Sequence, residues 1–149
     1  MDNNIYISRG GRFSFRLIDG WEEYDDDDDS THAFWHETET SWTGNFRITA
    51  FQWPNTNAPH VDKACEYITT ETAENAGAKR IILGKNDCAY YKKESQQDGV
   101  TNVVYYWITG KQNGIFICTF TIDKIQESML INERELTSIQ SMIASIKII

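Results

Sequence analysis

Hydrophobic and polar residues alternate in several stretches of this chain, and the alternation predicts β-strands. Phe13, Phe15 and Leu17 alternate with Ser14 and Arg16, a period of two that is typical of a strand with one buried face. Similar runs predict further strands at residues 5–7, 34–38, 45–53, 79–83, 87–95, 100–109 and 115–122. An Asp-Gly pair and an Asn-Gly pair separate the last three runs, and such pairs favour tight hairpins because both residues tolerate positive φ. Consecutive hairpins imply antiparallel pairing.

Two segments change to a helical period. Between residues 59 and 76 the inward positions recur every three or four residues, and Gly77 stands where a helix C-cap glycine belongs. Asn132 and Glu135 resemble a capping box that opens a second helix over 133–144, followed by a short edge strand at 147–149. The predicted fold class is therefore α+β, a central antiparallel sheet flanked by helices. Because no linker or repeat divides the chain, we expect a single domain over residues 1–149.

Two stretches resemble a known fold family. The strand at 13–17 with Asp19, Gly20 and Trp21 after it resembles the start of proteins with the Mog/PsbP-like fold. So does the late order of aromatic-rich strand, tight turn, strand, helix and closing strand. The resemblance implies an α/β/α sandwich, and the family consists largely of binding proteins: a Ran-binding nuclear import factor, photosystem II extrinsic subunits and adaptor chaperones of secreted effectors. The chain also resembles a small bacterial domain family of unknown function. No position matches a functional motif of these families, and Ile18 stands where relatives often have proline.

Charge is concentrated in one segment. The net charge is −8, and ten acidic residues without a single Lys or Arg lie between Asp19 and Glu39, which leaves 12 acidic against 14 basic residues elsewhere. Such a chain is repelled by phosphates and anionic lipid, so we expect neither nucleic acid nor a membrane as partner. The start of the chain has no basic region followed by an apolar run, and three cysteines show no metal-ligand spacing, which together indicate the cytoplasm. We expect no disulfide, Cys65 and Cys118 buried, and Cys88 partly exposed.

The candidates for catalysis or metal binding are weak. The run of five aspartates does not fit an EF-hand, because Ser30 and His36 occupy the glycine and glutamate positions. His32 and His36 would lie about 13 Å apart on a strand, too far to share one metal ion. The chain contains no nucleophile elbow, phosphate-binding loop or dinucleotide fingerprint. We therefore expect no catalytic residue, metal or cofactor, and a binding protein rather than an enzyme.

These observations lead to a functional hypothesis: a cytoplasmic protein-binding domain of adaptor or immunity type, whose acidic segment meets a basic surface on a partner protein. The expected contact residues combine negative charge with aromatic area: Trp21, Tyr24, Asp25, Asp26, Asp27, Asp28, Asp29, Phe34 and Trp35. The alternative for the acidic segment is a solubilising loop. The alternative function is a small-molecule-binding protein or enzyme with a pocket between sheet and helix, lined by His32 or His36. The oligomeric state is left open.

Overall fold

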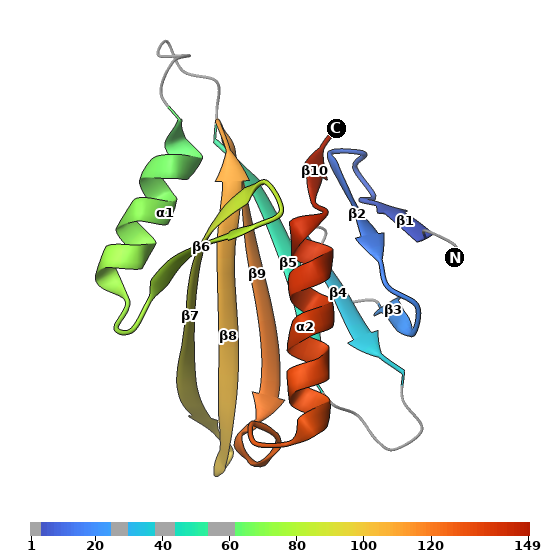
Figure 1. Ribbon diagram of the computed structural model, residues 1–149, viewed down its shortest axis with the longest axis vertical. Helices are drawn as coiled ribbons and strands as arrows, with labels where there is room; N and C mark the ends of the chain where they lie inside the picture. The colour runs from blue at the N-terminus through green and yellow to red at the C-terminus, as the bar shows by residue number, and fades with distance from the viewer. Residues whose placement is uncertain (1–3, 25–29, 38–43, 54–61) are drawn as a thin grey trace.

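A seven-stranded antiparallel sheet forms the centre of the molecule (Figure 1). The computed structural model describes residues 4–24, 30–37, 44–53 and 62–149. The strand order is β3-β4-β5-β9-β8-β7-β6, and every pairing among these strands is antiparallel. The strands are β3 (Trp21–Tyr24), β4 (Thr31–His36), β5 (Asn45–Gln52), β6 (Lys79–Leu83), β7 (Asn86–Gln97), β8 (Val100–Lys111) and β9 (Gly114–Asp123). The predicted α+β class and the hairpins β7-β8 and β8-β9 are confirmed.

Three strands form a second, smaller sheet that the sequence pattern did not predict. Its order is β1 (Asn4–Ile7), β2 (Phe13–Leu17) and β10 (Lys147–Ile148). The alternation in β2 points Phe13 and Phe15 inward, where both side chains are only 1% exposed. Together with helix α2 (Leu130–Ala144), this sheet covers one face of the large sheet and encloses the main core.

Helix α1 (Lys63–Glu74) covers part of the opposite face, so the large sheet stands between the two helices (Figure 1). Its N-cap is Asp62, whose carboxylate accepts a hydrogen bond from the Cys65 backbone N–H at 2.9 Å. Ala64 and Ile68 of α1 pack on strands β7, β8 and β9 in a second hydrophobic cluster. The predicted helix began at residue 59, but residues 59–61 lie outside the described part of the chain.

Two local predictions were wrong. Strand β3 lies where an acidic loop was expected, and it pairs with β4 from Trp21 opposite His36 to Tyr24 opposite Ala33. Helix α2 begins at Leu130, so Asn132 and Glu135 lie inside it and do not form a capping box. Both side chains are buried because they face the sheet: Asn132 donates to the Tyr105 hydroxyl at 3.1 Å, and Glu135 contacts His36.

The register brings distant parts of the chain to one end of the molecule. Gln52 at the end of β5 lies opposite Gly114 at the start of β9, next to the β8-β9 turn. Ile148 of β10 lies opposite Phe13 at the start of β2. Figure 1 shows the C-terminus at this end, beside β2 and near the end of β8. Several strands end here, and the side chains of these strand ends and of the adjoining turns line open hollows.

Candidate functional site

Three hollows open side by side at this end, with volumes of about 350, 610 and 450 Å³. The first and second share Lys111, Phe116 and Ile148, and the first and third share Arg12 and Ala50. We call this continuous depression the basic groove. It is formed by the β1-β2 turn, the end of β5, the β8-β9 turn, the β6-β7 turn and β10.

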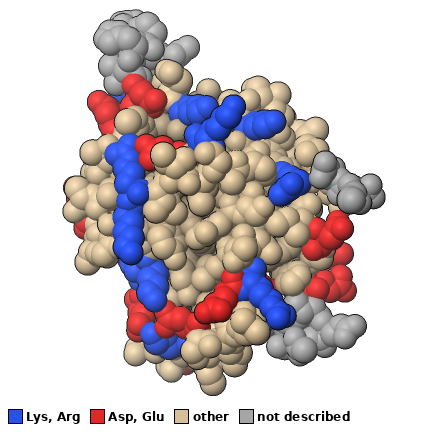
Figure 2. All heavy atoms as spheres, viewed as in Figure 1, with Lys and Arg blue, Asp and Glu red and all other residues tan. Residues whose placement is uncertain are grey.

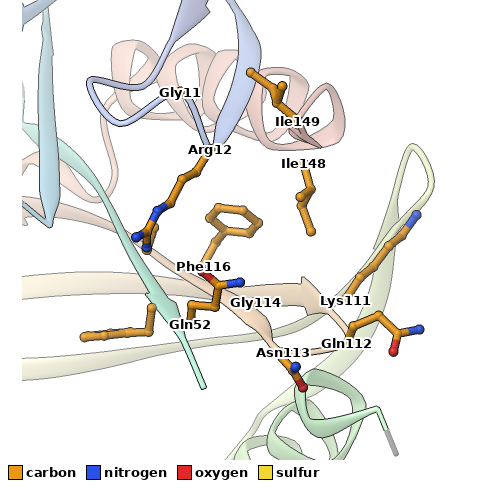
Figure 3. Close-up of a pocket in the computed structure, with 12 residues that line it drawn as sticks. Gly11, Arg12, Gln52, Lys111, Gln112, Asn113, Gly114, Phe116, Ile148 and Ile149 are labelled. Carbon is orange, nitrogen blue, oxygen red and sulfur yellow. The ribbon is translucent and has the colours of Figure 1, made fainter. Parts of the chain in front are cut away.

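The centre of the groove is apolar. Phe116 lies between Arg12 and Ile148 in Figure 3 and is largely buried, because alternation along β9 sends Ile115 to the α1 side and Phe116 to the groove side. Ile148 lines the same hollow and is 51% exposed, whereas Phe51 borders the hollow from β5 but pairs with Ile115 and so points to the α1 side. The groove therefore offers apolar contact area that folding alone does not use.

Gly110 keeps the β8-β9 turn close to the groove. It lines the second hollow, and a Cβ atom at this position would lie 2.1 Å from the Gly114 carbonyl oxygen. Any side chain here would push the two strands apart, so glycine is required by the close approach of backbone to backbone.

Positive charge lines the groove throughout. Among the described residues, the lining includes basic side chains and no acidic ones: Arg9, Arg12, Lys85, Lys111 and Lys147. Arg9 is paired with Glu23 at 2.8 Å, but within the described part of the chain the other four form no ion pair or side-chain hydrogen bond. Figure 2 shows Lys and Arg side chains gathered along the upper part of the molecule, at the end where Figure 1 places β10.

Basic side chains elsewhere are often neutralised by direct partners. Arg80 contacts Asp87 at 2.7 Å, and Lys92 contacts Glu127 at 2.6 Å. Lys124 bridges Glu94 and Glu127. The protein has a net charge of −8, so four cations around one concavity that have no ion pair among the described residues favour an anionic ligand there.

A hydrogen-bonded network borders the third hollow. His32 lines this hollow, and its Nδ1 lies 2.9 Å from the Tyr6 hydroxyl, which donates to Glu23 at 2.7 Å. Arg9 contacts the same carboxylate and also donates to the Thr31 carbonyl at 3.0 Å. Desolvation is the main cause that lowers the pKa of His32 and raises the pKa of Tyr6. His32 is therefore neutral near pH 7.

The second histidine serves a different part of the molecule. His36 Nδ1 lies 2.6 Å from a carboxylate oxygen of Glu135, and its ring stacks on Trp21 with 5.1 Å between centroids. This contact joins β4 to α2. His32 and His36 thus bind separate partners, and the described residues contain no group of three or more His, Cys, Asp or Glu side chains that could hold a metal ion.

Nearly the whole chain matches one protein family. Residues 1–148 match the family described as a domain of unknown function, DUF3805. The chain belongs to this family. A search of curated proteins finds no match. The expected membership of a domain family of unknown function is thus confirmed.

A search of solved structures found matches along most of the chain. A protein from Bacteroides thetaiotaomicron is 30% identical with a TM-score of 0.75 over 100% of this chain, which spans about half (49%) of that protein's length. LpqN of Mycobacterium tuberculosis, described as involved in cell envelope biogenesis, is 8% identical with a TM-score of 0.54, covering 97% of this chain and 89% of its own. A cyanobacterial PsbP from Synechocystis sp. PCC 6803 is 10% identical with a TM-score of 0.39, covering 98% and 92%.

Two predicted contact residues of this DUF3805 domain lie in its core. Trp21 is 3% exposed and Phe34 is fully buried, because β3 and β4 point both side chains toward the small sheet and α2. They therefore cannot offer contact area, which corrects the prediction. Tyr24 and Trp35 are partly buried, and the Tyr24 hydroxyl donates to Asn45 at 2.7 Å. The aspartates at 25–29 lie outside the described residues.

The cysteine predictions were only partly correct. All three are free thiols; Cys118 is buried as predicted, but Cys65 is exposed and Cys88 is buried. Cys65 lies at the margin of the α1 contact, where Arg80 approaches its sulfur at 3.6 Å. Cys88 faces the main core from β7, where desolvation raises its pKa to about 11.

The basic residues of the groove are not recognisable as one site in the sequence. Arg12, Lys85, Lys111 and Lys147 come from four separate turns or strand ends that lie far apart in the sequence. The available signal was indirect: outside the acidic segment, basic residues outnumber acidic ones.

None of the helices in the described ranges is long and apolar enough to cross a membrane.

Proposed function

We propose that this DUF3805 domain is a cytoplasmic protein-binding domain of adaptor or immunity type, and that the basic groove holds an acidic segment of its partner. The observation that supports this proposal is the set of four unpaired cations around the apolar centre of one concave end. Like charges held together without partners raise the energy of the free protein, and an anionic segment relieves this repulsion. Ile148, which is half exposed, supplies apolar area for the same contact.

The overall charge argues for a short acidic segment rather than a long polyanion. A nucleic acid or an anionic membrane would extend beyond the groove and meet a molecule of net charge −8. A short protein segment can occupy the groove and avoid the acidic remainder. Nucleic acid and membrane therefore remain excluded from the proposal.

The acidic segment from Asp19 to Glu39 provides a second proposed surface, for a partner with a basic surface. Two regions of opposite charge suit an adaptor that connects two proteins. Replacing Asp25–Asp29 with Asn and Ser should slow association with such a partner and reduce its salt dependence, because long-range attraction acts mainly on the association rate. Unchanged association at low salt in stopped-flow measurements would argue against this second surface.

A small anionic molecule is the alternative ligand of the groove. The three hollows, at about 350 to 610 Å³, have the size of sites that bind small molecules. Unpaired cations would bind a carboxylate or phosphate group of such a ligand.

Affinity capture from the native host tests the proposal. The groove variant carries Arg12→Glu and Lys111→Glu. The control carries Lys79→Glu and Arg134→Glu, which change charge equally at two exposed positions that neither line the groove nor form an ion pair within the described residues. Both variants should keep the circular dichroism spectrum of the wild type.

The expected result is a protein retained by the wild type and the control but lost from the groove variant. Neutralising an acidic segment of that protein should abolish its retention. Equal retention by the groove variant would refute the groove as the binding surface. Stabilisation of the wild type by inorganic phosphate or citrate, absent in the groove variant and without a captured protein, would favour the small-molecule alternative.

A further inference from the structure

The third hollow is lined by a buried histidine, one ring nitrogen of which has no hydrogen-bond partner among the described residues. The His32 side chain is buried, at 4% residue exposure, and its Nδ1 contacts Tyr6. Its Nε2 makes no hydrogen bond within the described residues. Fully buried side-chain atoms that lack a hydrogen-bond partner within the described residues include Trp107 Nε1 and Asn132 Oδ1. His32 lines the third hollow, and its Nε2 is not among these fully buried atoms.

The protons of Tyr6 and His32 are placed so that His32 Nε2 is a hydrogen-bond acceptor. Tyr6 has one hydroxyl proton, and it donates this proton to Glu23, which as a carboxylate can only accept. The contact between Tyr6 and His32 Nδ1 therefore requires Nδ1 to carry the proton and donate it. In a neutral imidazole the other nitrogen then holds a lone pair. The third hollow thus presents an unused acceptor at its wall.

The neighbouring charges restrict what can donate to this acceptor. Arg9 and Arg12 line the same hollow, so a cationic donor such as an ammonium group would be repelled. A hydroxyl suits the site, because one oxygen can donate to Nε2 and accept from a guanidinium. Arg12 also lines the first hollow. An anionic group beside the hydroxyl would therefore lie close to the Arg12 guanidinium.

We propose that the third hollow is a recognition pocket for a serine or threonine hydroxyl adjoining the acidic residues of the bound segment. This inference rests on the proposed function of the groove. It predicts sequence preference at one position, whereas the unpaired cations alone would accept any acidic segment.

Two peptide probes distinguish recognition of the hydroxyl from general binding of an acidic segment. One is a blocked pentapeptide with serine at the centre of four glutamates, and the other has alanine in place of serine. Isothermal titration calorimetry measures both against the wild type and His32→Asn. The asparagine amide can still donate to Tyr6, but nothing replaces Nε2. The serine peptide should bind the wild type about five- to tenfold more tightly than the alanine peptide, the effect of one neutral hydrogen bond. In His32→Asn the ratio should fall to about one.

A spectroscopic measurement on the wild type covers the case in which His32→Asn fails to fold. The ¹⁵N resonance of His32 Nε2 should move on adding the serine peptide and stay in place with the alanine peptide. Equal affinities of the two peptides for the wild type would overturn the inference. If both peptides bind equally and Arg12→Glu with Lys111→Glu abolishes binding, the groove proposal stands without the pocket. If neither peptide binds the wild type, both proposals fail.

Discussion

Replacing Phe34 with alanine tests the assignment of this side chain to the core. Phe34 is fully buried, and its ring centroid lies 5.1 Å from that of Tyr6, 5.4 Å from Phe15 and 6.0 Å from Phe46. Tyr6 and Phe15 belong to the small sheet, whereas Phe46 belongs to the large one. The side chain therefore connects the two sheets, and its removal leaves a cavity between them.

The size of the effect follows from this position. Deleting a buried phenylalanine side chain costs about 3–5 kcal/mol, and three aromatic neighbours place Phe34 in the upper half of that range. At this chain length, 1 kcal/mol corresponds to about 2–4 °C, so the melting temperature should fall by roughly 10–20 °C. Trp35 is the matched control, because it is the next residue on β4, points to the opposite face and is partly exposed. Trp35→Ala should cost about 1–2 kcal/mol.

Urea unfolding followed by far-ultraviolet circular dichroism measures both variants without depending on tryptophan fluorescence. The difference in free energy of unfolding between Phe34→Ala and Trp35→Ala should exceed about 2 kcal/mol. Equal losses, or a larger loss for Trp35→Ala, would refute the assignment of Phe34 to the core and restore it as a candidate contact residue.

Two further predictions concern titratable groups. Burial lowers the pKa of His32 below 6.5, so the unfolded chain takes up this proton at a higher pH than the folded chain does. The free energy of unfolding should therefore fall as the pH drops below about 6.5, by at most ~1.4 kcal/mol per pH unit. In urea titrations, His32→Asn should reduce this dependence on pH. An unchanged dependence would contradict the lowered pKa of His32. A maleimide should label Cys65 rapidly and Cys88 and Cys118 slowly, because burial raises the pKa of both inner thiols. Mass spectrometry of the digested protein distinguishes the three sites. Rapid labelling of Cys118 would show that this face of β9 is not buried.

Local patterns were sufficient for most strands and both helices. The hairpins β7-β8 and β8-β9 were predictable because their turn residues and alternating strands are adjacent in sequence. Strand β3 was missed because its four residues include two glutamates and follow a turn, so the alternation is too short to recognise. The pairing of β2 with β10 joins residues more than 130 positions apart, and no local pattern specifies such a partner.

The candidate site depended far more on tertiary structure. The aromatic residues of the acidic segment were correctly noted as large apolar side chains, but their exposure depended on which face of β3 and β4 meets the small sheet. Asn132 and Glu135 had the spacing of a capping box, yet Tyr105 and His36 became their partners because α2 packs on the sheet at those residues. A polar side chain on an inner helix face requires a partner, and that partner comes from elsewhere in the chain.

The sequence by itself determined the fold class, the antiparallel hairpins and the uneven charge, because these properties follow from residue type and short-range spacing. Only the tertiary structure decided where unpaired positive charge accumulates. Arg12, Lys85, Lys111 and Lys147 become neighbours through the register of β5 with β9 and of β2 with β10. Long-range pairing sets this arrangement, and it depends on the burial of whole faces rather than on any single segment.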